Sequence, residues 1–454
     1  MNIMHYSLGL PPFRTGGMIK YCMDLMVEEI KLGHNVYLLW PGRLKDFSEK
    51  MEIKVHKDYK INEENVLIHN IEIINPLPVP LLNGIKEFKE YMNTKNTDDM
   101  YKFLKNKEID ILHVHTLMGL PVEIIKICKE LNIKTIFTTH DYFGICPKWG
   151  LEKNGIACSN DRECKDCVKC NKNALSLNKI MFLQSNVYKF LKDSIFLKIL
   201  RRRNNSKLYI EDENSDVNED ISLSEKYKEL RTYYMKILEA FDVIHYNSCN
   251  TQMIYSKYIE NTSSGMVINI SHGSIKEKKK IKKITDSIVK IGYLGPITKH
   301  KGFFFLKNVC EKIYCENKNF ELHIFAQYNQ ELPYLKIHKP YKYNELEKVM
   351  EEFDILVVPS LWNETFGFTV LEALSFGKPV IVTNNVGSKD LIVQEKNGFI
   401  VECDEYKLEM KLKEIINNPQ KIENMNNYIV NNISIKTMEE HVKEILDLYL
   451  LKTN

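Results

Sequence analysis

The sequence predicts an α/β protein with two doubly wound domains, each a parallel sheet with helices on both faces. Strand-like and helix-like segments alternate up to about residue 140, the alternation breaks over residues 142–236, and a second alternating block follows Lys276–Lys283. Such alternation is typical of parallel sheets. A chain of 454 residues also exceeds what one hydrophobic core usually holds, so two domains are expected.

The first block begins with an apolar strand at Asn2–Ser7, followed by the glycine- and proline-containing loop Gly9–Gly17. Apolar residues at helical spacing predict a helix over Met18–Leu32, and Gly33 is placed to end it. Further elements are expected at Val36–Trp40, Ile109–His115, Pro121–Leu131, Lys134–Thr139, Glu225–Phe241, Asp242–Tyr246 and Met266–Ile270.

The second block reads as strands alternating with helices in the same way. Its strands are expected at Ile288–Leu294, Glu321–Phe325, Ile355–Pro359, Pro379–Val382 and Gly398–Val401, and its helices at Gly302–Tyr314, Asn344–Glu352 and Thr369–Phe376. A last helix is expected at Ile435–Leu451. The domains are therefore placed at residues 1–284, with the insertion at about 142–236, and at 285–434, with 435–454 as a terminal helix.

Composition and charge exclude several classes of protein. The net charge of +3 gives no basic domain of the kind that binds nucleic acid, so no nucleic-acid partner is expected. No apolar run approaches the roughly 20 residues of a membrane span, and the first residues do not resemble a signal peptide. We therefore expect a cytoplasmic protein whose cysteines are reduced or bind metal.

The segment from Pro359 to Pro379 carries the chemistry. A buried strand ends at Pro359, a loop presents Glu364, and a helix begins near Gly367. The start of a helix offers free N–H groups and a positive dipole, which suit a phosphate, and glycine lets a ligand approach the backbone. Glu364 and Glu372 would lie roughly 10 Å apart along a helix. That separation suits two acids that hold opposite ends of an elongated ligand better than the pair of a retaining hydrolase.

The run Glu-Thr-Phe-Gly-Phe through Gly-Lys-Pro, with Glu364 and Glu372 eight residues apart, resembles the signature of family 4 retaining glycosyltransferases of the GT-B fold. Gly16-Gly17 before a helix, Thr139-His140-Asp141 after a strand, and Gly295 with Lys301-Gly302 are similar to other parts of that family. The resemblance covers most of the chain except about 150–235. It implies two Rossmann-like domains that face a cleft, an acceptor-binding N-terminal domain, a nucleotide-sugar-binding C-terminal domain and a terminal helix that crosses back.

The resemblance also implies roles for individual residues. Glu364 and His140 would be catalytic, and the donor and acceptor would contact Gly16, Gly17, Gly295, Lys301, Phe366, Gly367 and Glu372. Glu372 would hold the ribose, Lys301 the leaving diphosphate, and Glu364 the sugar near its anomeric carbon. No metal is implied for the diphosphate, and no cofactor for catalysis. Simpler interpretations of these residues stay open. Lys301 could be a solvated lysine, Glu364 an exposed carboxylate and His140 a structural histidine. Gly16 and Gly17 could form only a tight turn.

Two positions depart from the family pattern. Pro296 stands where an arginine usually follows the glycine, so one charge for the diphosphate is missing. Val386–Asp390 replaces the usual Gly-Gly-hydrophobic-Pro-Glu segment near the donor sugar, which leaves the sugar open.

The insertion begins with a cluster of cysteines. Four thiols could form a structural zinc site, with an iron–sulfur cluster as the alternative and a loop of free thiols as the simplest interpretation. The expected ligands are Cys158, Cys164, Cys167 and Cys170, with Cys146 as a substitute. A similar cysteine pattern occurs in some glycosyltransferases of the family.

Residues 178–203 combine aromatic, aliphatic and basic side chains, which predicts either contact with an anionic membrane at its inner face or a helix packed on the domain. The function expected is retaining transfer of a sugar from a nucleotide diphosphate sugar to a saccharide or lipid-linked acceptor, in surface polysaccharide or glycolipid biosynthesis. The alternatives are a non-catalytic, metal-stapled scaffold or sensor with the same fold, and a nucleotide-sugar epimerase.

Overall fold

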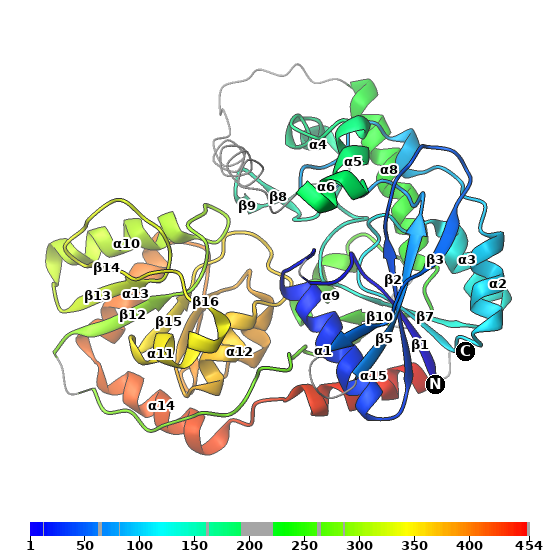
Figure 1. Ribbon diagram of the computed structural model, residues 1–454. Helices are drawn as coiled ribbons and strands as arrows, with labels where there is room; N and C mark the ends of the chain where they lie inside the picture. The colour runs from blue at the N-terminus through cyan, green and yellow to red at the C-terminus, as the bar shows by residue number, and fades with distance from the viewer. Residues whose placement is uncertain are drawn as a thin grey trace.

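The computed structural model describes residues 1–11, 13–61, 66–80, 82–159, 163–191, 221–260, 265–284 and 287–451. These ranges form two α/β domains side by side, with the terminal helix returning to the first (Figure 1). The doubly wound architecture predicted from the sequence is confirmed by two separate sheets whose central strands are all parallel. No helix in the described part of the chain is long and apolar enough to cross a membrane.

The sheet of the N-terminal domain has the strand order β11-β10-β7-β6-β1-β2-β5-β3, and β4 also pairs with β5. Its strands are β1 (Asn2–Tyr6), β2 (Asn35–Pro41), β3 (Glu52–Val55), β4 (Tyr59–Ile61), β5 (Val66–Ile74), β6 (Ile111–Val114), β7 (Lys134–Thr138), β10 (Val243–Tyr246) and β11 (Gly265–Val267). The pairs of β5 with β3 and β4 are antiparallel. None of these three strands was predicted. The strands β3 and β4 are half-exposed and lack a clear apolar pattern, whereas β5 is mostly buried.

The helices of this domain cover both faces of the sheet. They are α1 (Gly17–Lys31), α2 (Asp98–Asn106), α3 (Val122–Glu130) and α9 (Cys249–Tyr255). The α1 helix buries apolar side chains at helical spacing, among them Ile19, Cys22 and Met26. Its one buried charged group is Glu29, which the amphipathic pattern alone would not place inside.

The C-terminal sheet is fully parallel in the order β14-β13-β12-β15-β16-β17. Its strands are β12 (Val289–Tyr293), β13 (Phe320–Ile324), β14 (Leu335–Ile337), β15 (Ile355–Val358), β16 (Val380–Thr383) and β17 (Gly398–Val401), and its helices are α10 (Phe303–Glu316), α11 (Leu346–Glu351), α12 (Phe368–Ser375), α13 (Glu405–Asn417) and α14 (Gln420–Asn432). Of these, β14, α13 and α14 were not predicted.

The insertion forms a separate layer above the first sheet (Figure 1). It comprises the hairpin β8 (Glu152–Lys153) and β9 (Ile156–Ala157) with α4 (Lys165–Cys170), α5 (Leu177–Leu183), α6 (Asn186–Leu191) and α8 (Ile221–Glu239). The expected basic end of the 178–203 segment and the acidic stretch 211–219 lie outside the described residues.

Two segments tie the domains together. The lysine-rich connection runs along the C-terminal domain, where Lys282 pairs with Asp354 at 2.5 Å. The terminal helix α15 (Met438–Leu450) packs on α1, and Lys134 Nζ donates to the carbonyl of Leu448 at 3.0 Å. The end of the chain is therefore part of the N-terminal domain.

Candidate active site in the interdomain cleft

A cavity of about 490 Å³ lies between the two domains. It is lined from the first domain by residues at the start of α1 and at the ends of β7 and β10, and from the second by residues 362 and 364–368. Among the residues expected from the sequence it brings together Gly16, Gly17, His140, Glu364, Phe366 and Gly367. The carboxyl ends of parallel strands are where α/β folds bind ligands.

The N-termini of α1 and α12 meet at this cavity. Gly17 begins α1 and lies 3.5 Å, measured from an ideal Cβ, from the ring of Phe368, the first residue of α12. Gly16 has a φ of 124° and no atom within 4 Å of the position of a Cβ, so the backbone is open to a ligand there. Two positive helix ends with exposed N–H groups favour an anion.

Glu364 lines this cavity and is partly buried, with 13% of its side chain exposed. Its Oε1 is 2.5 Å from Lys301 Nζ and its Oε2 accepts a hydrogen bond from Ser360 Oγ at 2.6 Å. Burial alone would raise the pKa of Glu364, but the Lys301 ammonium group and the Ser360 hydroxyl outweigh it and lower the pKa. The carboxylate is therefore ionised and held in one orientation.

The turn that carries Glu364 is held from both sides. Ser248 Oγ of the N-terminal domain donates to the Thr365 carbonyl at 2.6 Å, and Thr365 Oγ1 donates to the His140 carbonyl at 3.2 Å. On the other side, Ser388 donates to Phe366 from its main-chain N–H. The unusual 386–390 segment thus supports this turn from behind, which its sequence did not reveal.

His140 lines the cavity at the end of β7, and its ring nitrogen Nε2 lies 3.2 Å from Nδ1 of His115. Burial, together with the nearby His245 and His441, lowers the pKa of His140 to about 3. The ring is therefore neutral at physiological pH. His115 does not line the cavity.

Glu372, Gly295 and Lys301 do not line the cavity, although Lys301 contacts Glu364, which does. Glu372 is buried on α12, and its Oε1 lies 3.2 Å from His272 Nε2. Tyr343 lies next to this pair, and burial and the Glu372 charge raise the pKa of its hydroxyl. Gly295 instead packs under the Tyr293 hydroxyl, with an ideal Cβ 3.2 Å from it.

The cavity has further side chains that the sequence reasoning missed. Trp149 from the insertion and Trp362 from the C-terminal domain face each other with ring centroids 5.2 Å apart. Arg14 lines the cavity and also a neighbouring pocket of about 340 Å³, which includes Trp40 and Tyr59. No motif marks these residues, because they meet only when the two domains and the insertion fold together.

The cysteine cluster surrounds a buried arginine. Arg231 of α8 is 4% exposed, its Nη2 lies 3.5 Å from Cys167 Sγ, and within the described residues its Nε and Nη1 have no hydrogen-bond partner. Within that same part of the chain, two groups of three metal-capable side chains have ligand atoms within 4.8 Å of one another, and neither includes a cysteine. The predicted zinc site stays a prediction.

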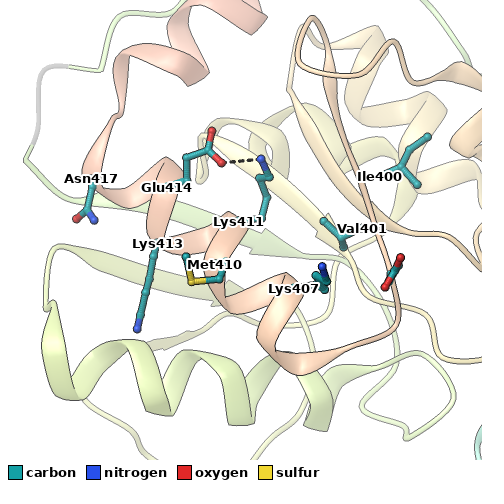
Figure 2. Close-up of a pocket in the computed structure, with 9 residues that line it drawn as sticks. Ile400, Val401, Lys407, Met410, Lys411, Lys413, Glu414 and Asn417 are labelled. Atoms are coloured by element: carbon teal, nitrogen blue, oxygen red, sulfur yellow. Dashed lines mark hydrogen bonds and ion pairs between the residues drawn. The ribbon is translucent and has the colours of Figure 1, made fainter.

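A second hollow lies on the C-terminal domain, between β17 and α13 (Figure 2). Its side chains include the ion pair Lys411–Glu414 at 2.6 Å, and none of the residues expected from the sequence. Residues of this groove therefore suit control substitutions, because they do not line the interdomain cavity.

Two families match the chain, one in each domain. The family described as "Glycosyltransferase Family 4" matches residues 15–156, and the family described as "Glycosyl transferases group 1" matches residues 274–432. The cavity lies between the two matched segments, and its residues come from both except for Leu8, Arg14, Asn247 and Ile270.

The chain is similar to several curated proteins. The chain is 24% identical over 406 residues, 85% of this chain and 86% of the other, to an "Uncharacterized 42.6 kDa protein in cps region" of Klebsiella pneumoniae. It is 32% identical over 113 residues (24% of this chain, 28% of the other) to the Escherichia coli "UDP-Gal:alpha-D-GlcNAc-diphosphoundecaprenol alpha-1,3-galactosyltransferase". It is 29% identical over 153 residues (31% and 40%) to the Staphylococcus aureus "Capsular polysaccharide biosynthesis glycosyltransferase CapM".

Solved structures share the fold over the whole chain. Sucrose-phosphate synthase from Thermosynechococcus elongatus has a TM-score of 0.56 at 12% identity, with 99% of this chain and 98% of the other covered. Anabaena Alr3699/HepE in complex with UDP and glucose has a TM-score of 0.53 at 11% identity, with 98% of both chains covered. The expected GT-B architecture is confirmed.

Proposed function

We propose that this chain, which matches one glycosyltransferase family in each domain, transfers a hexose from a nucleotide diphosphate sugar to a saccharide or lipid-linked acceptor, with retention of configuration. One observation carries the proposal: two helix N-termini and Glu364, which is paired with Lys301, meet at one interdomain cavity. A diphosphate is negatively charged, and its oxygen atoms can accept hydrogen bonds from the N–H groups at the two helix N-termini.

In this proposal the residues have separate roles. The amides at Gly16–Gly17 and Phe366–Gly367 bind the diphosphate, and Lys301 stabilises the charge that grows on the leaving group. Glu364 faces the sugar, and its fixed carboxylate orients the ring. With Pro296 in place of an arginine, Arg14 is a second cation at the same cavity. Glu372 reaches the ribose hydroxyls once it gives up its contact with His272.

We place the acceptor on the side of the N-terminal domain. Arg14 and Leu8 join the cleft to the pocket of Trp40 and Tyr59, where an aromatic face and polar groups suit a saccharide. Beyond this pocket, α5 and α6 expose Phe182, Val187 and Phe190 to solvent, at 46%, 59% and 88%. These side chains support contact with a membrane that holds a lipid-linked acceptor, and in this proposal the reaction takes place at the inner, cytoplasmic face.

The relatives' names support surface polysaccharide or glycolipid biosynthesis as the setting. We also propose that the cysteine cluster binds zinc as a structural staple. The support is Arg231, because a buried guanidinium with unpaired N–H groups needs an anion, and metal-bound thiolates supply one. Metal analysis of the purified protein with and without chelator tests this.

A screen of nucleotide diphosphate sugars by thermal shift, followed by transfer assays with the best donor, tests the proposed function. A true donor raises the unfolding temperature with its concentration, and transfer to an acceptor gives a product with the donor's anomeric configuration. A scaffold would show no turnover, and an epimerase would release the epimer without any acceptor.

A further inference from the structure

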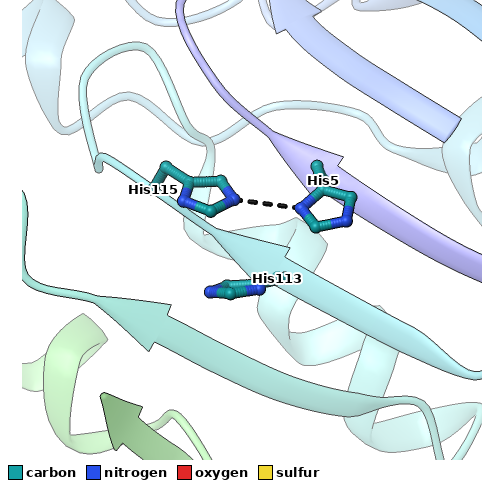
Figure 3. Close-up of side chains that lie close together, drawn as sticks. All are labelled: His5, His113 and His115. Atoms are coloured by element: carbon teal, nitrogen blue, oxygen red, sulfur yellow. Dashed lines mark hydrogen bonds between the residues drawn. The ribbon is translucent and has the colours of Figure 1, made fainter. Parts of the chain in front are cut away.

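Three buried histidines lie together beneath the cleft. His5 on β1 and His113 and His115 at the end of β6 are each fully buried, with ring centroids 4.3 to 5.3 Å apart (Figure 3). One nitrogen of each ring lies within 4.8 Å of the others, which suggests a metal site at first sight.

Hydrogen bonds argue against a metal. Every ring nitrogen of the three side chains already has its own partner, so no three lone pairs point at one position. The contacts are His5 Nε2 to Glu29 at 2.6 Å, His5 Nδ1 to His115 Nε2 at 3.0 Å, His115 Nδ1 to His140 Nε2 at 3.2 Å, His113 Nδ1 to Tyr449 Oη at 2.6 Å and His113 Nε2 to Thr138 Oγ1 at 2.6 Å.

We infer that Glu29, acting through His5 and His115, positions His140 so that its unprotonated Nδ1 faces the cleft and accepts a hydrogen bond from a hydroxyl group of the bound sugar or acceptor. The inference rests on the proposed function for the identity of that hydroxyl group. Among the described residues, Nδ1 of His140 has no hydrogen-bond partner, and the ring lines the cavity.

A side branch of the network runs from His245 through Thr138 and His113 to Tyr449, and its hydrogen bonds have defined directions. The Ile268 carbonyl can only accept, so His245 donates to it from Nε2 at 2.8 Å. Burial lowers the pKa of His245 to about 3, so the ring is neutral and its Nδ1 accepts from Thr138 at 2.9 Å. Thr138 then accepts from His113 Nε2.

The same reasoning continues through α15 to α1. Burial lowers the pKa of His113 well below its ordinary value, so its second nitrogen accepts from the Tyr449 hydroxyl. Tyr449 Oη also lies 2.9 Å from Glu29 Oε1, which joins this branch to α1. Glu29 Oε2 accepts a hydrogen bond from His5 Nε2 at 2.6 Å.

From Glu29 the chain leads to the cleft. His5 donates from Nε2, so its Nδ1 accepts from His115, and His115 Nδ1 accepts from His140 Nε2. Each contact from Glu29 to His140 then joins one donor to one acceptor. His140 is thus a hydrogen-bond acceptor at the cleft, with its tautomer set by residues on α1, β1 and β6.

Spectroscopy and kinetics on the full-length protein test the inference. The variants Glu29→Leu and His115→Phe interrupt the chain, whereas Glu29→Gln keeps an acceptor for His5 and a donor for Tyr449. His113→Phe is the matched control, because it lies in the same cluster but not between Glu29 and His140. Long-range ¹H–¹⁵N spectra of histidine-labelled protein, assigned with His140→Asn, report which nitrogen of His140 carries the proton.

We expect an Nε2–H tautomer of His140 in the wild type, in Glu29→Gln and in His113→Phe, and a mixture of tautomers in Glu29→Leu and His115→Phe. The same two variants should lose about tenfold or more in kcat, with a smaller change in KM for the donor. An Nδ1–H tautomer in the wild type, equal losses in His113→Phe and His115→Phe, or a bound metal ion that His5→Phe removes would overturn the inference. The tautomer is measurable without turnover, so failure of the proposed function is a separate result.

Discussion

Lys301 lies just before α10, and Glu364 lies in the loop that follows β15. The Nζ atom of Lys301 is 2.5 Å from Oε1 of Glu364. Burial opposes ionisation of Glu364, and the lysine reverses that effect on its pKa. In Lys301→Met the pKa of Glu364 should therefore rise, and the acid limb of the kcat profile should move to higher pH. Because a cation at the leaving group is also lost, we expect kcat at neutral pH to fall by about 10²–10³.

Lys301→Arg keeps the charge and should hold the acid limb near its wild-type position. Lys407→Met, in the groove of Figure 2, removes a lysine far from the cleft and serves as the control. A Lys301→Met profile that keeps the wild-type acid limb would contradict the coupling.

Replacement of Glu364 by Gln keeps the size of the side chain and removes its charge. We expect transfer to fall by about 10²–10³ in kcat, with less effect on the thermal shift caused by the nucleotide diphosphate alone, because the acid is proposed to face the sugar. Glu402→Gln, an exposed acid of the groove in Figure 2 that does not line the cavity, should behave as wild type. Equal activity of the two variants would remove Glu364 from the reaction.

The fold and the residues of the Glu364 turn could be predicted from the sequence, because the patterns that predict them are local. A strand, a glycine and a helix follow one another within a few positions, and the same holds for Gly16–Gly17. The Glu29–Tyr449 contact joins residues 420 apart, and the Trp149–Trp362 contact joins the insertion to the other domain. No local sequence pattern predicts contacts between residues so far apart in the chain. Half-exposed edge strands such as β3 and β4 were missed because burial on one face was too weak to show as alternation.

Gly302 begins α10 with a φ of 75°, and an ideal Cβ there would lie 1.7 Å from the Pro359 carbonyl oxygen. Gly33 has a φ of 86° but open space around the same position. Gly33→Ala should therefore cost about 1–2 kcal/mol of backbone strain. Gly302→Ala should cost clearly more, because the backbone at the cleft must also move. Urea unfolding midpoints compare the two, and equal losses would show that the contact with Pro359 relaxes freely.

The buried histidines should make the protein sensitive to acid. Burial lowers the pKa of His140 and His245 to about 3, and it lowers the pKa of His113 and His115 well below the ordinary value. In the unfolded chain these rings take up protons below about pH 6.5, whereas the folded state does not. The unfolded state then binds more protons, so the free energy of unfolding falls as the pH drops from about 6.5 toward 3.

Urea unfolding between pH 7 and 5 measures how the free energy of unfolding changes with pH. Most carboxylates titrate below this range, so the histidines dominate the change. Each histidine that is protonated only when unfolded contributes about 1.4 kcal/mol per pH unit. His113→Phe removes one such ring and should make the slope shallower by nearly that amount, even if the variant is less stable at pH 7. A free energy of unfolding that is constant between pH 7 and 5 would mean that these rings are already protonated in the folded protein, and the neutral network beneath the cleft would then be wrong.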